Sequence, residues 1–222
     1  MAATVVVGMR GAGKSTLGRR GAAARGATFV DMDEALEAAE GRSCGELVAQ
    51  RGWEGFRAAE LACLRAQLHA HPRDAVIACG GGIVETQPAR GLLGAHDGPV
   101  VHVERDVEDV VEYLEAKEQA QAAAQAADEV SEAESLARRP KYGESVRDVW
   151  ARRKPFFDEV STHHFCVARG DKDWEAIARE FEALVLAIFA PESPPAFAPG
   201  AVVRSVAAAD LAEPAGAEDG LR

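Results

Sequence analysis

A short apolar run followed by a glycine-rich loop with a Lys-Ser pair limits the possible folds of this 222-residue chain more than any other feature. Ala3–Gly8 is rich in β-branched residues, as is typical of a strand that is buried on both faces of a parallel sheet. Gly8–Ser15 reads GMRGAGKS, which fits the pattern G-x-x-x-x-G-K-[ST]. A helical pattern runs from Lys14 to Ala24. Strand, loop and helix in this order predict an α/β fold.

Further short apolar runs alternate with helical patterns along the chain. The expected strands are Thr28–Asp31, Ala75–Cys79, Pro99–Val103 and, more weakly, Phe165–Ala168. The expected helices are Asp33–Glu40, Cys44–Gln50, Glu54–Leu68, Val107–Ala116, Val146–Val160 and Trp174–Phe189. Strands that alternate with helices form parallel sheets with right-handed crossovers. The sequence therefore predicts a three-layer αβα domain over residues 1–190, with a sheet of five parallel strands.

Two segments break this alternation. Ala116–Ala137 is rich in Ala, Gln and Glu and has almost no large apolar residue, which predicts a solvated helix or a disordered insertion rather than part of the core. Pro191–Arg222 holds five of the ten prolines and shows little apolar periodicity. Such a composition is typical of a linker or a disordered tail, so we expect the domain to end near residue 190.

The charge balance and the cysteines exclude some classes of protein. The chain has 25 Lys and Arg against 36 Asp and Glu, a formal net charge of −11, whereas nucleic-acid binding needs a basic face. No apolar run approaches the roughly 18 residues of a membrane span, and no leader segment is expected. The cysteines lack C-x-x-C spacing, which favours buried thiols in a reducing compartment; they are Cys44, Cys63, Cys79 and Cys166. We therefore expect a cytoplasmic protein that binds neither nucleic acid nor membranes.

The glycine-rich loop indicates a phosphate site. Glycines permit backbone conformations that turn successive N–H groups inward around phosphates, and the helix that follows adds roughly half a positive charge at its start. Lys14 can bridge the β- and γ-phosphates, and the Ser15 hydroxyl can bind Mg²⁺. A loop that only has to be tight explains the glycines but not the Lys-Ser pair. The loop therefore predicts a site for ATP or GTP with magnesium, and it does not identify the acceptor.

Two aspartates stand where the second strand is expected to end, at the sheet edge where parallel α/β proteins bind ligands. Asp31 and Asp33 can divide two tasks, since one carboxylate can support the metal while the other accepts a proton from an attacking hydroxyl. Alternatively, the pair only caps the next helix, with Asp33 as the N-cap. The residues alone do not decide between these readings.

Arginines and a run of glycines offer further candidate binding groups. Arg57 and Glu60 lie at i and i+3 on one helix face, so Glu60 can hold the guanidinium; the alternative is a surface ion pair worth under about 1 kcal/mol. Gly80–Gly82 follows a strand and lets backbone approach a small ligand, or is a plain loop. Arg138–Arg139 and Arg152–Arg153 can stabilise phosphoryl charge or grip a carboxylate, or they form solvated basic faces.

Together these residues resemble the shikimate kinase family over nearly all of residues 3–189. The resemblance rests on GMRGAGKST, FVDMDEALE, GRSCGELV, GWEGFRAAE, CGGGIV, RRPKYGE and VWARRKPFFDEVS, in that order. The last two stretches look more like the kinase portion of the pentafunctional arom-type polypeptide of the shikimate pathway than like the free-standing bacterial enzyme. The chain is thus related to, or a fragment of, such a multifunctional polypeptide in this interpretation.

The resemblance implies a P-loop kinase fold with strand order 2-3-1-4-5, a lid at about 116–145, and ATP- and Mg²⁺-dependent phosphorylation of the shikimate 3-hydroxyl. Carried over by position, Asp33 would take the hydroxyl proton and contact the substrate, and Asp31 would support magnesium together with Ser15. Arg57 and Arg153 would bind the shikimate carboxylate.

The remaining roles follow from the same resemblance. Gly81 and Gly82 would line the shikimate ring, and Arg139 would be the lid arginine, catalytic together with Lys14. The nucleotide would be bound by Gly11, Ala12, Gly13, Lys14, Ser15 and Thr16.

The sequence also departs from the family pattern. Tyr113–Leu114 occupies the neighbourhood of the family's adenine-stacking arginine, so that residue is not assigned, and Arg138 competes with Arg139 as the lid cation. Two other functions stay open: a related small-molecule kinase with a gluconate-like acceptor, and a catalytically silent binding or assembly module of the same fold.

Overall fold

Short β-branched runs form a central parallel sheet. The structure is a computed structural model that describes residues 2–127, 143–189 and 201–204, with the backbone alone at 121–127 and 201–204. The strands run in the order β2-β3-β1-β4-β5-β6, and every neighbouring pair is parallel. Their bounds are β1 (Thr4–Val7), β2 (Thr28–Asp31), β3 (Ala75–Ala78), β4 (Val100–Arg105), β5 (His163–Val167) and β6 (Ala201–Arg204). The predicted order 2-3-1-4-5 is confirmed.

The sixth strand was not predicted. Residues 201–204 pair in parallel with His163–Cys166 of β5, although the sequence analysis assigns them to a linker or disordered tail. Their β-branched Val202 and Val203 are too short a run to stand out among the surrounding Ala and Pro residues, and the exposed edge of β5 supplies the partner that such a strand needs. The other residues of the predicted tail lie outside the described part of the chain.

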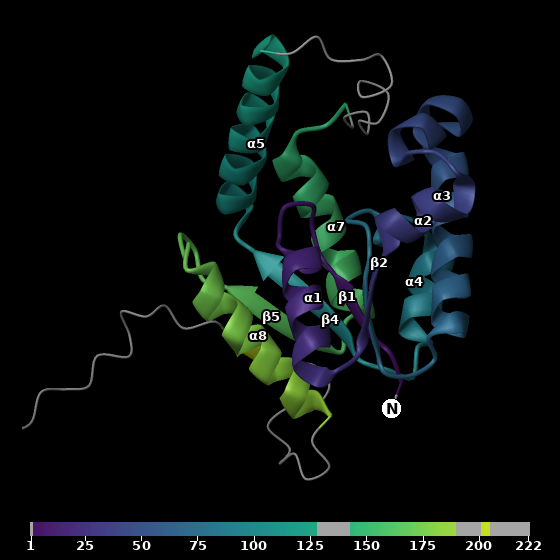
Figure 1. Ribbon diagram of the computed structural model, residues 1–222, viewed down its shortest axis with the longest axis vertical. Coiled ribbons are helices and arrows are strands. Elements are labelled where there is room, and N and C mark those ends of the chain that lie inside the picture. Colours follow the sequence, from purple (N-terminus) through teal and green to yellow (C-terminus); the bar gives the residue numbers. More distant parts are fainter. Residues whose placement is uncertain (1, 128–142, 190–200, 205–222) are drawn as a thin grey trace, which may run out of the picture.

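Helices cover both faces of the sheet (Figure 1). Apolar side chains alternate along each strand, so Val5 and Val7 of β1 join one core and Val6 joins the other. The helices are α1 (Lys14–Arg25), α2 (Met32–Glu40), α3 (Cys44–Ala70), α4 (Gln87–Gly94), α5 (Val107–Ala127), α7 (Val146–Val160) and α8 (Trp174–Ile188), with a 3₁₀ turn η1 (Ile83–Glu85). The pair α1 and α8 covers the face of Val6, and α2, α3, α4 and α7 cover the face of Val5. The three-layer prediction is confirmed.

Two helices differ by more than one residue from their predicted bounds, and α4 (Gln87–Gly94) was not predicted. The patterns Cys44–Gln50 and Glu54–Leu68 belong to one element, α3, which is interrupted by Gly52 at φ +66°, a left-handed conformation that glycine adopts without a steric cost. The capping box of Ser43 and Glu46 at its start is present. The helix α5 continues beyond Ala116 to Ala127, so this part of the predicted insertion is helical. Residues 128–142 of the predicted lid lie outside the described residues.

The carboxyl ends of β1, β2 and β3 carry groups that the sequence singled out. The phosphate-binding loop follows β1, Asp31 ends β2, and Gly80–Gly82 follows β3. Parallel strands bring these ends to one edge of the sheet. None of the described helices combines the length and the apolar composition that crossing a membrane requires.

Candidate active site

The loop between β1 and α1 has the backbone conformation of a phosphate cradle. Gly11 and Gly13 adopt φ +83° and +95°, values that L residues with a side chain rarely adopt. Because the N-cap of α1 is Gly13, the helix starts without a side-chain cap and without an acidic residue in its first turn, which leaves its positive end directed at the loop. Lys14 is 8% exposed, and its Nζ donates to the Met9 carbonyl at 2.8 Å. The cradle is thus held in shape by its own lysine.

Ser15, Asp31 and Asp33 form a short hydrogen-bonded chain beside this loop. Ser15 Oγ donates to Asp31 Oδ2 at 2.6 Å, and the Asp33 backbone N–H donates to Asp31 Oδ1 at 2.9 Å. Asp31 is therefore the N-cap of α2, and the alternative reading that placed Asp33 at the cap is wrong. Asp33 lies inside the helix, and its Oδ1 is directed at Gly80, where a Cβ would come within 3.1 Å of it.

The three glycines after β3 are the meeting point of the site. A Cβ on Gly80 would lie 2.5 Å from Glu60 Oε1, and a Cβ on Gly81 would lie 2.7 Å from the backbone nitrogen of Arg10 in the phosphate-binding loop. At Gly82 it would overlap the Arg57 guanidinium. The near atoms at Gly81 are backbone, which cannot swing aside as a side chain can, so this position requires glycine. That the loop contacts a small ligand stays a prediction.

Arg57 and Glu60 form an enclosed ion pair on α3. Arg57 Nη1 and Glu60 Oε2 are 2.6 Å apart, and the two side chains are only 10% and 3% exposed. An ordinary surface pair is therefore excluded. The guanidinium also lies near the rings of Trp53 and Phe56, with centroids at 5.5 and 5.2 Å from Cζ. Glu60 and the two rings fix the guanidinium against Gly82.

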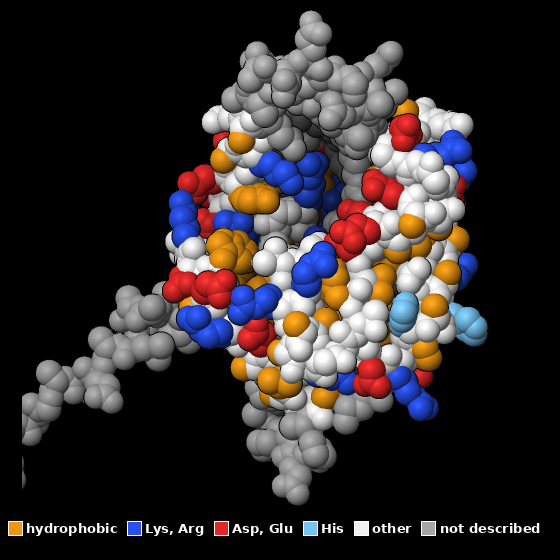
Figure 2. Space-filling view, in the orientation of Figure 1, with side chains coloured by type: hydrophobic (Ala, Val, Ile, Leu, Met, Phe, Trp, Pro, Cys, Tyr) orange, Lys and Arg blue, Asp and Glu red, His pale blue; other side chains and the backbone are white. Residues whose placement is uncertain are grey.

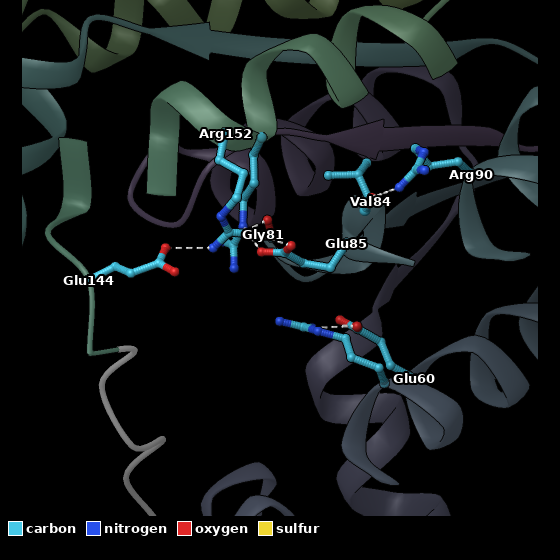
Figure 3. Close-up of polar contacts among 9 residues, drawn as sticks. Glu60, Gly81, Val84, Glu85, Arg90, Glu144 and Arg152 are labelled. Atoms are coloured by element: carbon cyan, nitrogen blue, oxygen red, sulfur yellow. Dashed lines mark hydrogen bonds and ion pairs between the residues drawn. The ribbon is translucent and has the colours of Figure 1, made fainter. Parts of the chain in front are cut away.

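Arg153 reaches the same glycines from α7, on the other side. Its side chain is buried, with Nη1 donating to the Gly81 carbonyl at 3.0 Å and Nε to Glu85 Oε1 at 2.6 Å. Arg152 also pairs with Glu85 and bonds Glu144 Oε2 at 2.7 Å. Figure 3 shows Glu85, Arg152 and Glu144 opposite the Glu60 ion pair. Arg57 and Arg153 thus meet on consecutive glycines.

Glu85 lies between two arginines and carries the clearest electrostatic signature of the site. Burial raises the pKa of its carboxyl, but the hydrogen bond and charge of Arg153, together with Arg152, outweigh burial and hold that pKa below its usual range.

Glu85 and Arg57 line one open depression of about 470 Å³ between α3 and the start of α4. Figure 2 shows a hollow in the surface, with Lys and Arg gathered on its α5 and α7 side and Asp and Glu on its α2 and α3 side.

Sequence reasoning missed a buried arginine behind the phosphate-binding loop. Arg105, at the end of β4, donates from Nη1 to the Gly11 carbonyl at 3.0 Å, and its guanidinium lies between the rings of Tyr113 and Trp174. Both rings also touch the loop, because a Cβ would meet Tyr113 at Gly11 and Trp174 at Gly13. The available signal was an arginine just after the predicted strand Pro99–Val103, at the sheet edge where the site lies. Glu85 was missed too, since only the fold brings it to Arg153.

The two candidate lid arginines, Arg138 and Arg139, lie outside the described residues. The other residues of the predicted site all lie within the described part of the chain. They are the nucleotide-loop residues 11–16, Asp31, Asp33, Arg57, Gly81, Gly82 and Arg153. All of these belong to the edge formed by β1, β2 and β3 and to the helices that overhang it.

A sequence model of the family described as shikimate kinase matches residues 10–185. The chain belongs to the shikimate kinase family. It is accordingly a kinase, as predicted, and the matched span includes residues 10–15 of the phosphate-binding loop, Asp33, Arg57 and Arg153.

Solved structures of this family resemble the chain over most of its length. The shikimate kinase of Acinetobacter baumannii in complex with shikimate is 26% identical, with a TM-score of 0.63 over 84% of this chain and 94% of that one. The enzyme of Bacteroides thetaiotaomicron is 20% identical, with a TM-score of 0.62 over 83% and 98%. That of Aquifex aeolicus is 21% identical, with a TM-score of 0.59 over 83% and 95%. The latter two support the fold.

Proposed function

We propose that this member of the shikimate kinase family transfers the γ-phosphoryl group of ATP to the 3-hydroxyl of shikimate, giving 3-phosphoshikimate and ADP for aromatic amino acid biosynthesis. The observation that carries the proposal is the meeting of Arg57 and Arg153 on consecutive glycines, beside Asp33 and the phosphate-binding loop. Two fixed guanidinium groups suit an acid whose alcohol faces the phosphate. No observation favours the gluconate-type kinase or the silent module.

The nucleotide end of the reaction is assigned to residues 11–16. The backbone N–H groups of Gly11–Thr16 would surround the β- and γ-phosphates, and the start of α1 would add its partial positive charge. Lys14 would exchange its contact with the Met9 carbonyl for phosphate oxygens, so its ammonium compensates the charge on the transferring group. For the adenine ring we propose Tyr113, which is 44% exposed and lies beside Gly11, because an exposed aromatic face stacks on a base.

Ser15 and Asp31 fit a magnesium ion. Both offer oxygen, the donor type that Mg²⁺ prefers, and their side chains already lie 2.6 Å apart. A bound Mg²⁺ would supply charge neutralisation and orientation of the phosphates. Asp31 would support the ion while keeping its hydrogen bond from the Asp33 backbone, so metal support and the start of α2 are joined in one side chain.

Asp33 is assigned as the proton acceptor. Arg57 and Arg153 would hold the shikimate carboxylate, and Gly81 and Gly82 would let the ring approach closely. Each guanidinium has five N–H donors, so it can bind its glutamate partner and the substrate together. The hydroxyl would then face the Asp33 carboxylate, which takes its proton as the oxygen attacks phosphorus in line.

Closure over the two substrates completes the proposal. Water would compete with shikimate as acceptor, so a segment that covers the site raises the yield of the transfer. We assign this role to residues 116–145, with Arg139 over the phosphates and Arg138 as its competitor. A cytoplasmic location and a relation to a multifunctional pathway polypeptide also remain parts of the proposal.

Shikimate-dependent release of ADP from the purified chain tests the reaction. We expect turnover with ATP, Mg²⁺ and shikimate and little turnover with gluconate. Asp33→Asn should lower kcat by about 10²–10⁴ while ATP binding stays nearly intact, and Glu34→Gln, on the next and exposed residue, is the control. Equal loss of ATP binding and turnover in Asp33→Asn would give Asp33 a structural role instead.

The acceptor pocket has a separate test. Arg153→Ala should raise the KM for shikimate by about 10–100-fold, the effect of losing a hydrogen bond to a charged group, and should change the KM for ATP much less. Arg152→Ala is the matched control, because Arg152 shares Glu85 but is exposed to solvent. Unchanged shikimate affinity in Arg153→Ala would remove this residue from the pocket.

A further inference from the structure

Two histidines and an aspartate gather on the sheet face that α7 covers, and none of the three has a role in the proposed reaction. His102 of β4 and His164 of β5 are direct partners in the parallel register, so their side chains stand on the same face. Their rings lie 5.5 Å apart. Asp158, on the last turns of α7, points between them.

The three side chains converge through their ligand atoms. Nδ1 of His102 lies 3.6 Å from Asp158 Oδ1, and Nδ1 of His164 lies 4.0 Å from the same oxygen. All three ligand atoms lie within 4.8 Å of one another. These separations exceed hydrogen-bonding distance, so the groups face one another without bonding.

His102 gives the independent reason to expect a ligand here. It is 3% exposed, and its Nδ1 has no hydrogen-bond partner among the residues that the structure describes. A buried polar atom without a partner is costly, yet this one is directed at Asp158.

We propose that His102, His164 and Asp158 form a binding site for a divalent transition-metal ion of the zinc class. Two imidazoles and one carboxylate are a common donor set for such ions and a poor one for Mg²⁺. In a tetrahedral site with metal–ligand bonds of about 2.0–2.1 Å, ligand atoms lie about 3.3 Å apart. Small rotations of His164 and Asp158 therefore suffice to close the site, and a fourth position is left for water.

The residues around the three side chains leave an ion access from solvent, and Lys154 competes with the ion for Asp158. Asp158 is 42% exposed in its side chain, which gives an ion a route from solvent. Lys154 contacts Asp158 at 3.3 Å and Glu104 at 3.0 Å. A bound ion would displace Lys154 from Asp158, and Lys154 would keep Glu104 as its partner. Binding thus exchanges one ion pair for three coordinate bonds.

An ion at this position would join α7 to β4 and β5. The helix α7 also carries Arg153, five residues before Asp158. Metal binding would therefore fasten the helix that presents the proposed carboxylate-binding arginine. This consequence is structural, and it is independent of whether shikimate is the acceptor.

Calorimetric titration of Zn²⁺ into the untagged, EDTA-treated full chain tests the site directly. We expect one Zn²⁺ per chain, insensitive to millimolar Mg²⁺, and a higher Tm with Zn²⁺ than without it. His164→Ala and Asp158→Asn should each weaken Zn²⁺ binding at least tenfold. These two positions are chosen because the fully buried His102 stacks on Phe157, and its replacement endangers folding.

Two control variants separate this site from other donors. His69→Ala removes an exposed histidine at the end of α3, and Cys166→Ser removes the thiol that contacts Glu104 on the same sheet face; both should bind Zn²⁺ as the parent does. The proposal is overturned if the parent chain shows no stoichiometric binding, if His164→Ala binds equally well, or if Cys166→Ser alone abolishes binding. Far-UV circular dichroism of each variant verifies that the comparison is made between folded proteins.

Discussion

The guanidinium of Arg57 lies directly against the Cα of Gly82, in space that the Cβ of any other residue would occupy. The position of this arginine is therefore set from two sides, by Glu60 on its own helix and by a missing side chain on the loop after β3. Arg153 donates a hydrogen bond to the carbonyl of the preceding glycine, Gly81. Because the guanidinium groups of Arg57 and Arg153 contact two consecutive glycines, the backbone of this loop sets the distance between them.

Gly82→Ala should move Arg57 without disturbing the rest of the fold. The atoms in the way belong to the end of a flexible side chain, so the arginine can swing aside at little cost in stability. We expect a rise of about tenfold or more in the KM for shikimate, the effect of a weakened charged hydrogen bond, with the Tm nearly unchanged. Gly91→Ala on α4, where a Cβ meets nothing within 4 Å, is the matched control. A KM equal to that of the control would mean that Arg57 does not bind the acceptor.

Glu60→Ala should be strongly destabilising. It would leave the Arg57 guanidinium enclosed without its carboxylate, and breaking a buried pair in this way costs about 3–5 kcal/mol of unfolding free energy. Urea denaturation measures the loss. Glu54→Ala, exposed on the same helix, should stay within about 0.5 kcal/mol of the parent chain. A loss below 1 kcal/mol for Glu60→Ala would show that the pair is well solvated.

The stabilising contribution of Glu85 should depend on pH. Its pKa is lower in the folded chain than in the unfolded chain, so the contribution is fully present above the ordinary glutamate pKa of about 4.3. It is lost as the pH falls further through the folded-state value. We therefore expect the stability difference between the parent and Glu85→Gln to be largest at neutral pH and to shrink on acidification below about pH 4. Urea denaturation at neutral pH and below about pH 4 measures this stability difference, with Glu54→Gln as the control. A difference that is the same at the two pH values would contradict the lowered pKa of Glu85.

Arg105→Met should affect the nucleotide more than the acceptor. The substitution keeps an unbranched chain between Tyr113 and Trp174 but removes the hydrogen bond to the Gly11 carbonyl. Because that bond holds the phosphate-binding loop from behind, we expect a KM for ATP about 10-fold higher or more and a nearly unchanged KM for shikimate. Steady-state kinetics with each substrate varied in turn separates the two. Arg65→Met, on an exposed position of α3, is the control, and equal changes in both KM values would point to general loosening.

Local chemistry explains which features were predictable. The loop of residues 8–15 and the capping box at Ser43 are short patterns whose geometry follows from a few neighbouring residues. The strands β1 and β3 are continuous buried runs and were found with small errors at their ends. The bounds of β5 were less accurate, because its two histidines interrupt the apolar pattern that marks a strand. The strand β6 was missed because its run of β-branched residues is too short to stand out among the surrounding Ala and Pro, and its pairing with the edge strand β5 is visible only in the fold.

The sequence by itself determined the parallel α/β architecture and the phosphate-binding loop, since both follow from residue types at fixed short spacings. The tertiary structure decided which charges meet. It enclosed Arg57 with Glu60, brought Glu85 to Arg153, and placed Arg105 behind Gly11. It also brought His102 and His164 to Asp158. These relationships depend on strand register and helix packing between segments tens of residues apart, and no local spacing in the chain encodes them.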